Sequence, residues 1–339
     1  MRSSSQQALV DTFFTNLHAS VGVGAEMVYD VSDCAFAKAR SHLHMPALSW
    51  LNDWVIERAQ TAGIVQRWRG LCLVAADASV HGADTSERAM LMQALDCLGP
   101  DDVLLLARVY PVAWLVSILC ERGIRFCMRC DKEVTGWSAV KQFLRSGADQ
   151  AMVTLSAPTD QDVQDRGCSP DALRVRLVRN VSSNAKVRVM ATNLDPADFP
   201  WECFGALHHK RWRIEEAFKR LKHHMKLESV SGLSQQAVII DVATKVLADN
   251  LASLLCACAL EGDCTEQPEH SVKRQCNRGY ATAAMLRMLP GVLMFVGDVL
   301  AAISHTLDLL RRTTCRIIAG RSSERPKSHV KPHAQNAYK

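Results

Sequence analysis

The sequence has no long hydrophobic segment. No apolar run reaches the ~20 residues that a helix needs to cross a bilayer. The nearest candidate, residues 285–310, is interrupted by Pro290, Gly291, Gly297 and Asp298. The first residues, MRSSSQQALVDTFF, also lack the apolar centre of a signal peptide. We therefore expect a cytoplasmic protein that does not span a membrane, with the interrupted segment forming buried helices.

The chain also has no strong charge of either sign. Its 40 Lys and Arg residues exceed its 35 Asp and Glu residues by only five. Such a mild basic excess permits a nucleic-acid partner but does not require one. The 339 residues, of which 48% are hydrophobic, can form a packed core and suggest two or three structural parts.

Cysteine is plentiful, but its spacing does not predict a metal site. The 13 cysteines are scattered, and the pairs Cys127/Cys130 and Cys256/Cys258 lack the second pair that a structural zinc site requires. We expect reduced thiols, as is usual in cytoplasmic proteins.

Residues 1–66 have helical patterns throughout. In VSDCAFAKARSHL, Ser32 or Asp33 can cap a helix that carries Phe36 and Leu43 at helical spacing, with basic residues between them. This region is either a small DNA-contacting unit or a set of packing helices, and the sequence favours neither interpretation.

Strands and helices alternate through residues 67–130. RWRG is expected to be a linker, and the apolar runs LCLVAADASV, DDVLLLARVY and IRFCMRC are typical of strands buried on both faces. SERAMLMQALDCL and PVAWLVSILCERG have the pattern of the intervening helices. This order predicts an α/β fold.

The sequence after residue 130 predicts three further structural parts. Residues 131–200 form a β-rich insertion, in which the alternating LRVRLVR indicates a half-exposed antiparallel strand. Residues 201–320 are helical, with one long helix over 201–226 and mostly helix over 235–320. Residues 321–339 are polar, basic and proline-containing, which predicts a disordered tail.

One polar stripe borders the buried face of the long helix. At about 100° per residue, His208, Arg211, Glu215 and Lys222 fall within roughly 60° of arc. The adjoining arc is apolar and contains Ile214, Phe218, Leu221 and Met225. The opposite, solvated side contains Arg213, Arg220 and His224.

The stripe has two interpretations. Arg211 and Glu215 can be an ordinary surface ion pair, which contributes only ~0.2–0.5 kcal/mol. Alternatively, a carboxylate flanked by cations can hold a metal ion while the cations hold phosphates, which is an arrangement for phosphoryl transfer.

The segment HHKRWRIEEAFKRLK resembles a signature of DDE-type transposases from insertion sequences. The branch is the IS-four-like family with a Tyr-Arg-Glu-Lys motif, in which Arg follows Tyr after two residues, Glu after three more and Lys after six more. Arg211, Glu215 and Lys222 match this spacing, whereas His208 replaces the Tyr. The resemblance covers roughly residues 25–320.

The resemblance implies a ribonuclease-H-like core and a site that uses two Mg²⁺ ions to cut and rejoin DNA at transposon ends. Asp77, within the first core strand, and Glu215 are then the catalytic and metal-binding carboxylates, although Asp77 can also be a turn residue at the end of the strand. His208, Arg211 and Lys222 are the DNA-binding residues. The implied partner is double-stranded DNA, and the sequence leaves open whether the protein forms a homodimer.

The second Asp of the family motif is missing. The family has an apolar run followed by Asp-Arg-Gly-Tyr, whereas this chain has Ala107, Arg108, Val109 and Tyr110. Asp102 lies five residues earlier on an extended strand, about 16 Å away at ~3.3 Å per residue, and cannot replace it. Asp101 lies farther still.

The sequence between the first strand and the next helix is also too short for the pair of strands that the family fold has there. The fold places a β-hairpin between its first strand and the next helix, and a hairpin needs about twelve residues. Only residues 78–85 are available. With the changes at His208 and Ala107, this gap predicts a degenerate copy whose DNA cleavage is impaired.

Two further interpretations stay open. The chain can be a DNA-binding protein without chemistry, which occupies transposon ends through residues 1–66 and a basic helix face. That face would include Lys210, Arg213, Lys219, Arg220, His223 and His224. The chain can also be a non-functional product that folds poorly.

Overall fold

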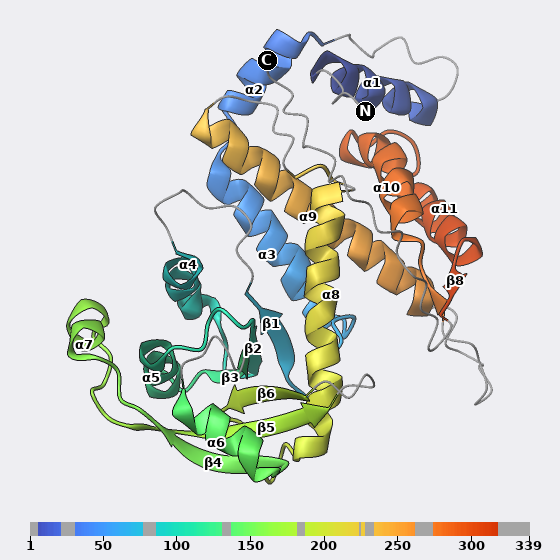
Figure 1. Ribbon diagram of the computed structural model, residues 1–339. Helices are drawn as coiled ribbons and strands as arrows, with labels where there is room; N and C mark the ends of the chain where they lie inside the picture. Colours follow the sequence, from blue (N-terminus) through green and yellow to red (C-terminus); the bar gives the residue numbers. More distant parts are fainter. Residues whose placement is uncertain are drawn as a thin grey trace, which may run out of the picture. The chain divides into compact units, whose positions relative to one another are not determined.

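The computed structural model describes residues 6–21, 31–76, 86–130, 137–181, 187–223, 225–227, 234–261 and 274–317 (Figure 1). The chain divides into two compact units. The core unit is continuous, Gln66–Glu216, and the helical unit combines Met1–Val65 with Ala217–Lys339. The expected tail, residues 321–339, lies outside the described residues.

The core unit contains one six-stranded sheet, in the order β1-β2-β3-β6-β5-β4. The strands are β1 (Cys72–Ala75), β2 (Asp102–Leu106), β3 (Arg125–Cys130), β4 (Gln150–Leu155), β5 (Leu173–Val181) and β6 (Val187–Thr192). β1, β2 and β3 are parallel, and β6, β5 and β4 continue the same sheet in antiparallel pairings. The α/β class is therefore confirmed, and strands of residues 131–200 extend the sheet through the β3–β6 pair.

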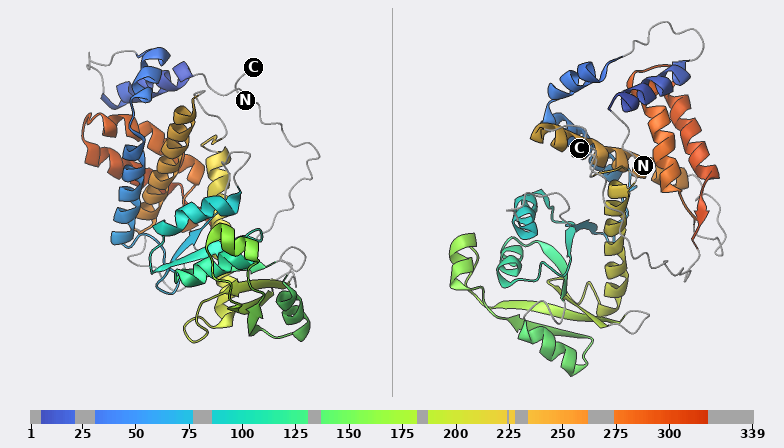
Figure 2. Two further views of the ribbon diagram at one scale, coloured as in Figure 1. Left: turned by 90° about the vertical axis from the view of Figure 1, so that its left-hand side faces the viewer. Right: turned by 45° about the horizontal axis from the view of Figure 1, so that its top comes forward.

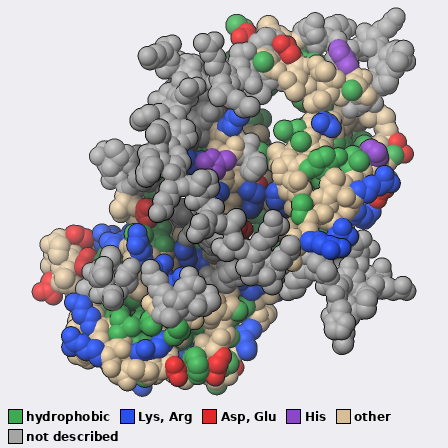
Figure 3. Space-filling view, turned by 45° about the vertical axis from the view of Figure 1, so that its right-hand side comes forward, with side chains coloured by type: hydrophobic (Ala, Val, Ile, Leu, Met, Phe, Trp, Pro, Cys, Tyr) green, Lys and Arg blue, Asp and Glu red, His purple; other side chains and the backbone are tan. Residues whose placement is uncertain are grey.

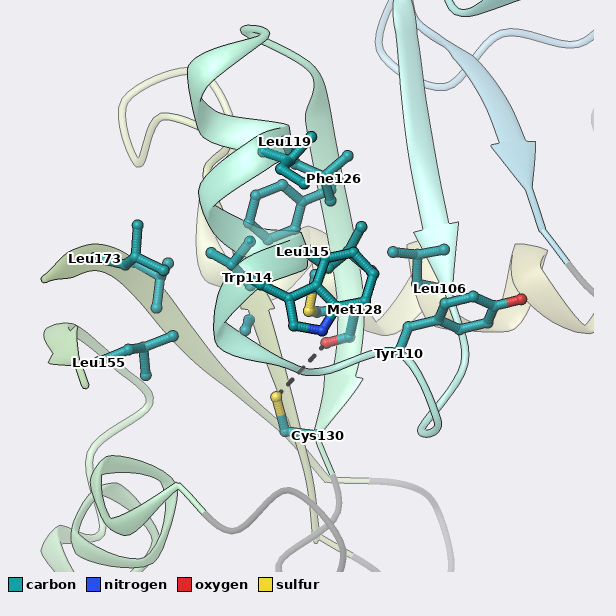
Figure 4. Close-up of a cluster of buried hydrophobic side chains, with 14 of the residues drawn as sticks. Leu106, Tyr110, Trp114, Leu115, Leu119, Phe126, Met128, Cys130, Leu155 and Leu173 are labelled. Carbon is teal, nitrogen blue, oxygen red and sulfur yellow. Dashed lines mark hydrogen bonds between the residues drawn. The ribbon is translucent and has the colours of Figure 1, made fainter. Parts of the chain in front are cut away.

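Helices cover both faces of this sheet. One face packs against α4 (Glu87–Ala94), α5 (Ala113–Glu121) and α6 (Ser138–Ser146) in a large apolar cluster that contains Leu106, Tyr110 and Trp114 (Figure 4). The 3₁₀ helix η1 (Leu95–Cys97) follows α4, and α7 (Asp160–Arg166) connects β4 to β5. The other face packs against η2 (Trp201–Cys203) and α8 (Phe204–His223).

Three sequence-based expectations for this unit were wrong. β1 is short and half-buried rather than buried on both faces, because within the described residues it pairs only with β2. β5 is antiparallel but mostly buried, and even Arg176 is only 2% exposed. The expected linker RWRG contributes Trp68 to the core, where its ring stacks on Phe199 with centroids 5.4 Å apart.

The start of α4 provides a stability prediction. Ser86 Oγ accepts a hydrogen bond from Ala89 N at 3.2 Å and so caps the helix, as its Ser-x-x-Ala start permits. Ser86→Ala should lower the free energy of unfolding by about 1 kcal/mol in urea titrations. Ser86→Asp keeps an acceptor at this position and should unfold like the wild type. An equal loss in both variants would show that the cap is not the cause.

The helical unit contains most of the remaining helices, which Figure 2 shows in two further orientations. They are α1 (Gln6–Val21), α2 (Asp33–Ser41), α3 (Met45–Thr61), α9 (Gln235–Glu261), α10 (Arg278–Leu293) and α11 (Val299–Arg312). α1 packs on α10, α3 packs on α9, and α10 and α11 pack on each other and on α9. Ser32 caps α2, which confirms one of the two cap candidates.

Pro290 lies inside a helix without ending it. α10 continues through Pro290 and Gly291 and ends at Leu293. Proline has no N–H to donate to the carbonyl four residues earlier, which is that of Leu286. Asn16 Nδ2 approaches this oxygen at 3.5 Å and supplies a donor from α1. None of the described helices is long and apolar enough to span a membrane.

Candidate active site at the carboxyl ends of β1 and β2

The carboxyl ends of β1 and β2 lie side by side. The strands are parallel, and their register runs from Cys72 opposite Asp102 to Ala75 opposite Leu105. Asp77 follows two residues after β1 and lies outside the described residues. Ala107 directly follows β2, is half-buried, and accepts a hydrogen bond from Tyr110 N at 3.2 Å in a turn. The end of β2 therefore provides no carboxylate.

Two acids at the beginning of β2, Asp101 and Asp102, are engaged there. Asp102 Oδ2 accepts a hydrogen bond from Gly99 N at 2.7 Å. Asp101 Oδ2 lies 3.7 Å from Arg67 Nη1, in an exposed ion pair. Asp102 and Leu106 are the first and last residues of the strand, so neither acid can replace a ligand at position 107.

α8 brings a basic residue to the end of β2. Phe204 and Leu207 are fully buried against Val103 and Leu105, which fixes this side of the helix on the sheet. Arg211 follows Leu207 by one helical turn on the same side. A small cleft results, lined by Leu105, Leu106, Met190, Leu207, Arg129 and Arg211.

Arg129 is a cleft residue that sequence analysis did not identify. It lies on β3, and strand alternation places it on the same face as Cys127, which packs in the cluster beneath α8. The alternation of side chains along IRFCMRC already indicated that Arg129 and Cys127 share a face of the sheet. Arg129 of β3 and Arg211 of α8 thus both border this small, mainly apolar cleft.

Arg176 anchors the beginning of α8 to the sheet. Its Nη1 donates to Phe199 O at 2.7 Å and to Leu194 O at 3.5 Å, and its Nε donates to Gln150 Oε1 at 2.9 Å. The guanidinium also lies 5.3 Å from the centre of the Phe204 ring. Burial lowers the pKa of Arg176 from its ordinary value. This side chain joins β5 to the segment that leads into α8.

The remaining stripe residues are only partly described. His208 and Glu215 lie within α8, but their side chains are outside the described part of the structure. Lys222 is exposed near the end of the same helix. Arg220 does not point into solvent as expected, because it forms an ion pair with Asp249 of α9 at 3.1 Å.

The cysteine pair of β3 does not form a metal site. Cys127 packs beneath α8, whereas Cys130 packs in the cluster on the other face of the sheet. Burial raises the pKa of the Cys130 thiol to about 12 and also raises that of Cys127. The two thiols therefore lie on opposite faces of the sheet and do not converge on one site.

Comparison with known proteins identifies the family. A family model described as "Transposase DDE domain" matches residues 69–251, slightly more than half of the chain. The chain belongs to the transposase DDE domain family. No curated protein matches the sequence.

The matched range contains the whole candidate site of this transposase-family chain. It begins just before β1, contains Ala107 and the whole of α8, and ends within α9. Transposase DDE domains act on DNA and generally use divalent metal ions. Within the described residues, no group of three His, Cys, Asp or Glu side chains could hold such an ion.

Proposed function

We propose that this chain is a transposase of the Tyr-Arg-Glu-Lys branch that binds the ends of its insertion sequence but is impaired in cutting them. The proposal assigns the metal-binding carboxylates to Asp77 and Glu215, and the DNA contacts to His208, Arg211 and Lys222. The observation that carries it is the cleft beside β2, where Arg211 of the family motif lines the end of the strand that lacks its acid.

The strand register supports the place of Asp77 in this proposal. Ala75 pairs with Leu105, and the same register, if continued for two more residues, would bring position 77 beside position 107. Leu73 and Ala75 pack on the side of the sheet that α8 covers. Because side chains alternate along a strand, position 77 would face that side as well.

The face of α8 supports the place of Glu215. Leu207, Arg211 and position 215 are spaced four residues apart, and such positions share one side of a helix. The first of them is buried on the sheet, and the second lines the cleft at the end of β2. The third continues this line, which would direct the Glu215 carboxylate toward the ends of β1 and β2.

The proposed impairment follows from the ligand count. A two-ion site positions its metals with three carboxylates in this family, and Mg²⁺ bound there stabilises charge on the attacking and leaving oxygens. Asp77 and Glu215 supply two of them, Ala107 supplies none, and the acids of β2 are engaged at its other end. The residues present do not fit a complete two-ion site.

The same observation favours one alternative function. A chain that retains Arg129 and Arg211 in the cleft but lacks a metal ligand can bind DNA without cutting it. Such a protein would occupy transposon ends and exclude active relatives. The ribonuclease-H-like core is proposed in either case, with the hairpin of that fold missing beside β1.

Binding to end DNA tests both versions. We expect the full chain to bind a duplex carrying the element's end more tightly than a scrambled duplex of equal length, as measured by fluorescence anisotropy. Arg211→Gln and Lys222→Gln should each weaken binding about tenfold at 0.1 M salt, because each removes one phosphate contact. Lys141→Gln, an exposed change on α6, is the matched control. Equal binding by all four proteins would refute the DNA-contact assignment.

A further inference from the structure

Two arginines face each other across a short β-ladder in the helical unit. β7 (Arg274–Gln275) and β8 (Cys315–Arg316) form an antiparallel pair in which Arg274 is directly opposite Arg316. All four residues are exposed. Directly opposite residues project from the same face of a sheet, with Cβ atoms about 5 Å apart, and like charges in such a pair are destabilising. An anion between the two guanidinium groups would reverse this effect.

The basic charge of the chain is concentrated in the part of the sequence that contains β8. Residues 311–339 contain eight Lys or Arg residues and one Glu, a net charge of +7. The whole chain carries only +5, so residues 1–310 carry a net charge of −2. The mild basic excess of the protein therefore belongs entirely to the segment that begins at the end of α11 and contains β8.

The dipole of α11 explains only some of these basic residues. Arg311 and Arg312 lie in the last turn of α11, where positive charge favours the helix dipole. Arg311 also donates to Asp308 Oδ1 at 2.7 Å and to Ala259 O at 3.4 Å. Arg274 and Arg316 lie in strands rather than in a helix, so the dipole does not explain their pairing. Figure 3 shows one face of the molecule, on which Lys and Arg side chains are exposed at several places.

We propose that Arg274 and Arg316 form a second DNA-binding site, which contacts the phosphate backbone independently of base sequence. Guanidinium groups bind phosphate oxygens through paired hydrogen bonds, and two adjacent groups match the repeated phosphates of one strand. That the bound polyanion is duplex DNA rests on the proposed function of the chain. The site itself rests on the strand register and the charge distribution.

Salt-dependent binding of duplex DNA tests the site. The full chain carrying Arg274→Gln and Arg316→Gln should bind any duplex about 50-fold more weakly at 0.1 M salt than the wild type does. The slope of log K against log salt should fall in magnitude by about two, because two phosphate contacts are lost. The loss should be equal for end DNA and scrambled DNA. The control is Lys141→Gln with Arg145→Gln, which removes two exposed charges from α6.

The outcomes separate this proposal from the function on which it rests. An unchanged slope in the Arg274/Arg316 variant, with end DNA still bound, would overturn the second site alone. A wild-type chain that binds no duplex would overturn both. Binding to vesicles of anionic phospholipid but not to duplex would also overturn the site as a DNA contact.

A charge-reversal variant provides an independent readout. Arg316→Glu places opposite charges across the ladder, so Tm of the DNA-free protein should rise or stay constant while DNA binding weakens. This opposite response is expected of a site that is maintained for a ligand at the expense of stability. A lowered Tm together with unchanged DNA affinity would show that the arginine pair is merely structural.

Discussion

Wild-type protein mixed with Mg²⁺ and a duplex carrying the element's end should leave both strands intact. Removing a single preorganised stabilising group from an active site commonly lowers the rate by about 10²–10³. Here the missing group is a carboxylate that positions metal ions, because Ala107 stands at the end of β2. Denaturing gels with end-labelled DNA, run with Mg²⁺ and with Mn²⁺, measure the cleavage.

Ala107→Asp should not restore cleavage. Ala107 packs against the apolar cluster that contains Leu106 and Tyr110. A carboxylate added there would meet apolar surroundings, and the residues between β1 and α4 remain too few for a hairpin. Cleavage by the wild type that disappears in Glu215→Gln would contradict the proposed impairment. Rescue by Ala107→Asp would contradict the role given to the lost hairpin.

Arg176→Ala should lower the free energy of unfolding by about 3 kcal/mol. The change leaves the carbonyl of Phe199 and the side chain of Gln150 without a buried donor, and it opens a cavity beside Phe204. Arg176→Lys should recover little of this loss, because one ammonium group cannot reach all the acceptors of a planar guanidinium. Urea titration followed by circular dichroism measures the effect.

Arg174→Ala is the matched control for this prediction. Arg174 lies two residues earlier on β5 and is exposed, so its loss should change stability by no more than about 0.5 kcal/mol. If the Arg174 and Arg176 variants unfold at the same urea concentration, Arg176 does not anchor α8 as described.

The elements that depend on local pattern were predictable from the sequence. The runs DDVLLLARVY and IRFCMRC contain β2 and β3, because continuous apolar residues are typical of central strands in a covered sheet. The helices after Ser32 and Ser86 begin where a side-chain oxygen can cap them. The fixed spacings of the family motif predict an acid at position 107, where the sequence has Ala.

The features that depend on distant residues were not predictable. Alternation along LRVRLVR suggested an exposed Arg176, but the segment around Phe199 and Phe204 covers it and accepts its hydrogen bonds. The sequence did not indicate that α10 continues through Pro290, where Asn16 of α1 approaches the carbonyl that proline leaves without a donor. The role of Arg129 became apparent only when β3, β2 and α8 were seen to share one cleft. In each case the deciding contact joins residues far apart in the chain.

Anomalous diffraction from crystals of the full chain soaked in Mn²⁺ tests the central claim most directly. We expect one Mn²⁺ ion held between the carboxylates of Asp77 and Glu215, with no second ion beside Ala107. Two well-occupied ions there would contradict the proposed impairment. Carboxylates of Asp77 and Glu215 that lie on separate surfaces, too far apart to share an ion, would contradict the assignment of the site itself.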